Sequence, residues 1–138
     1  MSIGFHDTAS VSPRADIGEH VLIDGLSFVG PGAKLGDETR LGAGVIIGDR
    51  VMVGERCKIS HGAVLTTGTV VADDVFIGAR VVTMGVIQIL KGVVIAAGAT
   101  ICGGDEGTPL VIDEYAVVGP GAVVTQDVPP GTPPVLEA

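Results

Sequence analysis

Three histidines are the side chains of this 138-residue sequence best suited to moving a proton near neutral pH. Imidazole titrates in that range and can act as a general base or as a metal ligand. His61 stands in the small and aliphatic stretch ISHGAV, whereas His20 directly follows a glutamate and His6 lies close to the start. His61 is therefore the first candidate for chemistry, and His6 and His20 are interpreted as surface or structural residues.

The elements that must position His61 are strands and tight turns, because the composition disfavours helices. The chain has 22 Gly, no Trp, one Tyr and three Phe, although 46% of its residues are hydrophobic. Val, Ile, Leu and Ala supply that apolar content, which indicates a narrow all-β interior. Cys57 and Cys102 form no CxxC pair, so we interpret both as small core or turn residues. The length predicts a single domain, 1–138.

The charge excludes several kinds of partner. A formal net charge of −8 leaves no basic stripe for nucleic-acid phosphates and disfavours an anionic membrane surface. The opening MSIGFHDTASVSPR lacks the charged head and apolar run of a secretion signal. The uncharged stretch 92–104 is glycine-rich and shorter than a bilayer requires. We expect a cytoplasmic protein that binds neither nucleic acid nor membrane.

A repeat of six residues organises the chain. Eleven consecutive steps of six carry an aliphatic residue, and four positions after each comes a small or β-branched one. The aliphatic series is Ile17, Ile23, Val29, Leu35, Leu41, Ile47, Val53, Ile59, Leu65, Val71 and Ile77. Glycine follows the aliphatic residue in seven of these eleven hexads, where we expect the backbone to need room to turn.

Hexads such as LGAGVI, IGDRVM and VGERCK resemble the hexapeptide-repeat superfamily, and the resemblance covers the chain from about 11 to 128. It implies a left-handed parallel β-helix of about six to seven triangular coils, with residues 18 apart stacked at about 4.8 Å. We expect a lead-in at 1–10, coils at 11–128 and a tail at 129–138. The string GDEGTPLV delays Ile112 by eleven residues instead of six, which predicts an excursion loop at about 104–111.

Coils of 18 residues sort the hexads into three faces, one of which is apolar. Its outward sixth positions include Phe28, Ile46, Val64 and Val82. Soluble monomers rarely expose a strip of this kind. The family is typically trimeric, so the resemblance implies a homotrimer that covers this face.

The resemblance extends to a site. In related sugar N-acetyltransferases with a VDHDCV hexad, the catalytic base occupies the position of His61, in a groove between subunits. The resemblance thus implies an acetyltransferase that uses acetyl-CoA and a small-molecule acceptor, for which we favour a nucleotide-linked amino sugar. The Ala79 backbone amide would stabilise the oxyanion, and Ala79, Arg80, Ala97 and Lys91 would contact coenzyme A. Alternatively, His61 fills a gap in a subunit contact.

A metal site is not expected. Hexapeptide-repeat carbonic anhydrases need three converging imidazoles, and the spacing of the three histidines does not match theirs. A file of carboxylates could attract a hard cation, although we interpret it as a hydrated acidic face. It comprises Glu19, Asp37, Glu55 and Asp73.

The C-terminal string departs from the family. Relatives with VVTKDVPP carry a cation that helps to hold the phosphates of coenzyme A, whereas this chain has Gln126 in VVTQDVPPGTPPVLEA and lacks their basic tail. The competing hypothesis is a trimeric scaffold or binding module that has lost coenzyme A binding. A lesser one is that the loop receives a partner or a small acid.

Overall fold

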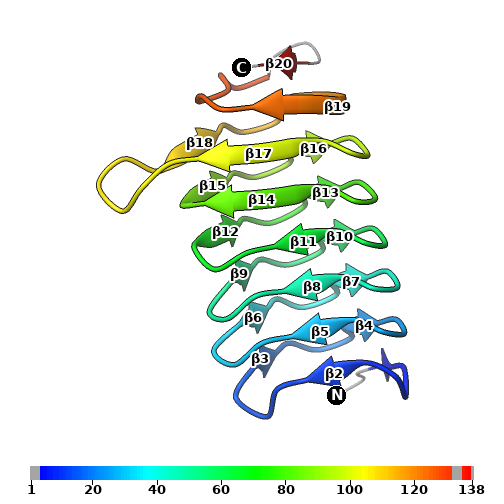
Figure 1. The fold of residues 1–138 in the computed structure, drawn as a ribbon. Helices are drawn as coiled ribbons and strands as arrows, with labels where there is room; N and C mark the ends of the chain where they lie inside the picture. Colours follow the sequence, from blue (N-terminus) through cyan, green and yellow to red (C-terminus); the bar gives the residue numbers. More distant parts are fainter. Residues whose placement is uncertain (1–3, 132–134, 138) are drawn as a thin grey trace.

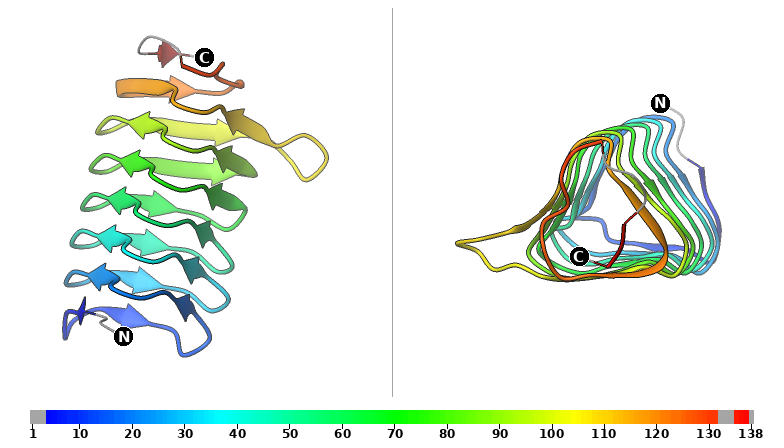
Figure 2. Two further views of the ribbon diagram at one scale, coloured as in Figure 1. Left: turned by 180° about the vertical axis from the view of Figure 1, so that it is seen from behind. Right: turned by 90° about the horizontal axis from the view of Figure 1, so that it is seen from above.

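The computed structural model describes residues 4–131 and 135–137. It is a left-handed parallel β-helix of about six coils, each a triangle of three short strands joined by three corners (Figures 1 and 2). Strand partners are 18 residues apart, as in the pairing of Phe28 with Ile46 and of Ile46 with Val64. The predicted fold class is confirmed, and so is the length of the coil.

The strands stack into three columns. The first contains β1 (Gly4–Phe5), β4 (Leu22–Ile23), β7 (Arg40–Leu41), β10 (Lys58–Ile59), β13 (Phe76–Ile77), β16 (Val94–Ile95) and the start of β19 (Val117–Val124). The second contains β2 (Ser10–Val11), β5 (Phe28–Val29), β8 (Ile46–Ile47), β11 (Val64–Leu65), β14 (Val82–Gly85), β17 (Thr100–Gly103) and the end of β19. The third contains β3 (Asp16–Ile17), β6 (Lys34–Leu35), β9 (Met52–Val53), β12 (Thr69–Val71), β15 (Ile87–Ile89) and β18 (Leu110–Ile112), and β20 (Val135–Glu137) pairs with β19.

The aliphatic series fills the interior. From Ile23 to Ile77 every one of its residues is at most 3% exposed. Burying such a side chain contributes roughly 1.5–3 kcal/mol, so the stacked aliphatics supply the main driving force for the coil. Thr83 interrupts the series, yet its hydroxyl lies 2.7 Å from that of Thr69 and accepts a hydrogen bond from the Thr66 N–H. The buried hydroxyls are therefore paired.

Where a glycine follows the aliphatic residue, it allows close packing between coils. A Cβ on Gly36 would lie 2.5 Å from the carbonyl carbon of Gly54, one coil further on. The left-handed backbone that turns the corner occurs two residues later, at Glu38 (φ 63°) and Arg56 (φ 55°). Our sequence interpretation placed the turn at the glycine, whereas the glycine instead leaves room for the neighbouring backbone.

The coil is slightly longer than its expected boundaries. β1 pairs with β4, so the ladder begins inside the segment expected as a lead-in, and β20 continues it within the expected tail. Residues 1–3, 132–134 and 138 of those two segments lie outside the described residues. The excursion projects from one corner (Figure 2). It ends before Leu110, because Leu110 is buried and pairs with Ile87, so 110 and 111 belong to β18.

In the described part of the chain, no helix has the length and apolar character needed to cross a bilayer.

Candidate functional site

His61 lies at the corner between the first and second strand columns, which we call the His61 corner. The corner positions of successive coils hydrogen-bond along the stack: the Gly62 N–H donates to the Ala43 carbonyl and the Arg80 N–H to the His61 carbonyl, both at 3.0 Å. His61 therefore stacks between Ala43 and Ala79, as the 18-residue spacing predicts. Its side chain is exposed, and its ring makes no hydrogen bond to a described residue.

Gly42, in the coil that precedes His61, allows the two coils to stack closely at this corner. A Cβ on Gly42 would lie 2.7 Å from the backbone nitrogen of His61 and 3.2 Å from its Cα. The preceding coil is therefore in close contact with the His61 backbone, and this contact fixes the position from which the imidazole projects.

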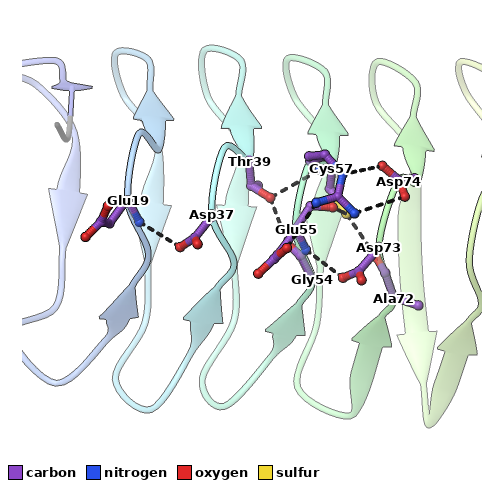
Figure 3. A network of polar contacts seen from close by, with 10 residues as sticks. Glu19, Asp37, Thr39, Gly54, Glu55, Cys57, Ala72, Asp73 and Asp74 are labelled. Atoms are coloured by element: carbon purple, nitrogen blue, oxygen red, sulfur yellow. Dashed lines mark hydrogen bonds and ion pairs between the residues drawn. The ribbon is translucent and has the colours of Figure 1, made fainter. Parts of the chain in front are cut away.

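We call the corner between the third and first columns the acidic corner. It shows the direction of the backbone N–H of the third residue in a hexad. There the Glu19 N–H donates to Asp37 Oδ1 at 2.9 Å, and the Glu55 N–H donates to Asp73 Oδ1 at 2.8 Å (Figure 3). Each amide is thus met by the aspartate at the same position of the next coil. These carboxylates serve the turns themselves.

The same position at the His61 corner lacks such an acceptor. Ala97 stands one coil beyond Ala79, and a methyl group cannot accept a hydrogen bond. Within the described residues, the Ala79 N–H makes no hydrogen bond. An uncommitted amide one coil from an exposed imidazole is a suitable donor for a developing oxyanion.

Arg80 lies beside His61, and Lys91 does not. Arg80 has a left-handed backbone (φ 61°), and its Cγ lies 3.3 Å from the position of a Cβ on Gly62, so its stem covers that glycine. Lys91 belongs to the acidic corner, where its carbonyl accepts the Tyr115 N–H at 2.9 Å. Strand β16 separates it from Ala97, so the chain alone brings together the other four predicted site residues and leaves Lys91 apart.

The acidic corner carries an ion-pair network. Arg56 Nε lies 2.8 Å from Asp74 Oδ1, and Arg56 Nη1 lies 3.0 Å from Glu55 Oε1. The hydrogen bond from Arg56 lowers the pKa of Asp74, while burial raises the pKa of Cys57. Among the described residues, no group of three or more His, Cys, Asp or Glu side chains is placed to hold a metal ion.

The outward residues of the second column form the apolar strip, which we define as Phe28, Ile46, Val64, Val82, Thr100 and Val123. They pair in register from coil to coil. Phe28, Ile46 and Val123 are 41%, 43% and 49% exposed in the single chain. The strip borders the His61 corner, because β11 begins directly after that corner.

Sequence reasoning missed the outward residues of the first column. Arg40 and Lys58 occupy the sixth positions of LGDETR and VGERCK, and they stand directly opposite each other on β7 and β10. The charges at the sixth positions of that face would have indicated the pair. The interpretation of the face rested instead on the polarity of its corner residues.

Two family models match the chain. "Bacterial transferase hexapeptide (six repeats)" matches residues 14–49 and 35–67, and "Hexapeptide repeat of succinyl-transferase" matches residues 68–102. Together the two models cover residues 14–102, and the chain belongs to the hexapeptide-repeat family. The sequence resemblance is thereby confirmed. A comparison with curated proteins finds no match.

Solved structures share the fold. The Arabidopsis UDP-N-acetylglucosamine acyltransferase is similar at a TM-score of 0.78 and 20% identity, over 89% of this chain and 49% of that one. A mutant perosamine N-acetyltransferase from Caulobacter crescentus, in complex with CoA and GDP-perosamine, has a TM-score of 0.53 and 21% identity, over 92% and 50%. PerB from the same organism, with the same ligands, has 0.54 and 23%, over 93% and 51%. The chain spans about half the length of these proteins.

Proposed function

We propose that the chain is an acyltransferase that moves the acetyl group of acetyl-CoA to an amine or hydroxyl of a small acceptor. The observation that carries this proposal is the pairing of an exposed imidazole at His61 with an uncommitted amide at Ala79, one coil apart. The family models agree with acyl transfer, and two of the similar structures hold CoA.

In the proposed reaction His61 is the general base. Its ring takes the proton of the acceptor amine as the amine nitrogen bonds to the acyl carbon. The Ala79 N–H donates to the acyl oxygen as negative charge develops there. His61 then returns the proton to the sulfur as the carbon–sulfur bond breaks, so the base is regenerated in each turnover.

The proposed contacts of coenzyme A include Arg80 and Ala97. They lie one and two coils beyond His61, towards the C-terminus. Arg80 is exposed and supplies a fixed cation for phosphate. Lys91 is proposed as a further phosphate contact from the acidic corner. At the His61 corner itself the described residues offer a nucleotide donor one cation, the Arg80 guanidinium, and Gln126 supplies no charge.

A homotrimer is part of the proposal. A solvated apolar strip six residues long is unfavourable, and closure of three copies around an axis would cover it. The His61 corner borders the strip, so the imidazole would then stand at the edge of a subunit contact. A nucleotide-linked amino sugar is the acceptor that we favour, in view of the GDP-perosamine held by the similar transferases.

Thermal unfolding with added acetyl-CoA tests the proposal. A ligand that binds only the native state raises its stability, by about 2.7 kcal/mol at one hundred times its Kd. We expect a clear rise in Tm, and a smaller rise for Arg80→Gln. An unchanged Tm at millimolar acetyl-CoA would favour the non-catalytic scaffold.

A further inference from the structure

A groove of about 460 Å³ follows the outside of the first strand column towards the His61 corner. Leu22, 45% exposed, supplies an apolar wall, and Arg40 and Lys58 stand beside it on the same outward face. Gly42 lines its end at the corner, in the contact with the His61 backbone described above. The volume is typical of small-molecule sites.

The two cations of this groove form no ion pair with a described carboxylate, whereas Arg56 binds Asp74 and Glu55. Arg40 and Lys58 are partners in register on β7 and β10, where like charges repel. In a chain of net charge −8, this is a local positive site that an anion would relieve.

The carboxylate of the groove, Asp24, forms no ion pair with Arg40 or Lys58. Asp24 lies at the end near the corner, and its Oδ1 accepts a hydrogen bond from the Gly25 N–H at 2.7 Å. The groove therefore presents the apolar Leu22 on β4 and two cations on β7 and β10, and it reaches the His61 corner at Gly42. A ligand that matches it carries a flat apolar group and a phosphate group.

We propose that this groove binds the nucleoside diphosphate part of the acceptor. Arg40 and Lys58 bind the two phosphates, and the base packs against Leu22. This inference rests on the proposed function, because it makes the groove the acceptor side of His61. The donor then approaches along Ala79 and Ala97, one and two coils beyond His61, and the acceptor from the coils before it.

Calorimetric titration of the full chain with UDP and with GDP tests the assignment. We expect saturable binding of at least one of them, weakened roughly ten- to a hundredfold by Arg40→Gln and by Lys58→Gln, since each loses a charged hydrogen bond. Lys34→Gln is the matched control, because Lys34 is an exposed lysine at the same hexad position on the third column. It should leave the affinity unchanged.

Two further probes distinguish the contribution of the phosphates to binding from that of the base. Pyrophosphate should bind more weakly than the nucleotide, and Leu22→Ser should weaken nucleotide binding while leaving pyrophosphate unaffected. Equal affinity for pyrophosphate and both nucleotides would overturn the role of the apolar wall, and an equal loss in Lys34→Gln would overturn the site.

The acetyl-CoA experiment keeps this inference distinct from the proposed function. Binding of acetyl-CoA without binding of UDP or GDP at millimolar concentration would refute the groove and leave the transferase standing. Nucleotide binding that depends on Arg40 and Lys58, without acetyl-CoA binding, would support the groove and refute the transferase.

Discussion

The contact between Gly42 and the His61 backbone gives a prediction that joins the fold to the chemistry. A Cβ in Gly42→Ala would lie 2.7 Å from a backbone nitrogen, and no rotation of a side chain can relieve that contact. Ordinary van der Waals separation is about 3.4–4 Å, so the two coils must move apart by about 0.7 Å or more at this corner. Overpacking of this kind costs about 3 kcal/mol, and for a chain of this length that lowers Tm by about 10 °C.

Gly44→Ala is the matched control. A Cβ there meets nothing within 4 Å, but the residue has φ +68°, so only backbone strain of about 1 kcal/mol is expected. Thermal unfolding of both variants measures the difference. At a temperature where both are folded, Gly42→Ala should also lose acyl transfer, because a displacement near 1 Å can cost on the order of a hundredfold in rate. Equal Tm values for the two variants would refute the close stacking at His61.

Three further predictions concern other parts of the molecule. Thr83→Val should cost roughly 1–3 kcal/mol in unfolding free energy, because it leaves the buried Thr69 hydroxyl unpaired, and a double-mutant cycle with Thr69→Val should show coupling between the two. Ile46→Asp should convert the proposed trimer to monomers in sedimentation velocity, since it places a carboxylate on the apolar strip, and an unchanged mass would refute that proposed interface. The Arg56 ion pair lowers the pKa of Asp74 below 3.8, so its stabilising effect is complete above that pH and is lost as the pH falls through the lowered pKa. NMR titration of Asp74 should show a return towards 3.8 in Arg56→Gln, and an unaltered pKa would contradict the pairing.

The sequence predicted the coil well because a six-residue period places an aliphatic residue inward at each step. The spacing also placed His61 between Ala43 and Ala79, and it aligned Phe28 with Ile46. These features follow from one translation of 18 residues along the chain. They depend on no side-chain conformation.

Features that depend on contacts between coils could not be predicted in this way. The lack of a hydrogen-bond acceptor for the Ala79 N–H is recognised only by comparison with the Glu19 N–H, which donates to the Asp37 carboxylate. The early end of the excursion loop depends on the burial of Leu110 beside Ile87. By contrast, the place of Lys91 at the acidic corner of a single chain does follow from the order of the hexads.

The central claim is that His61 is the general base of acyl transfer, and thiol release from acetyl-CoA tests it most directly. The assay runs over a panel of amino sugars and their nucleotide conjugates, with wild type, His61→Ala and the control His20→Asn at the acidic corner. We expect acceptor-dependent release in wild type and His20→Asn, and a loss of about a hundredfold or more in His61→Ala. Full activity of His61→Ala would contradict the account.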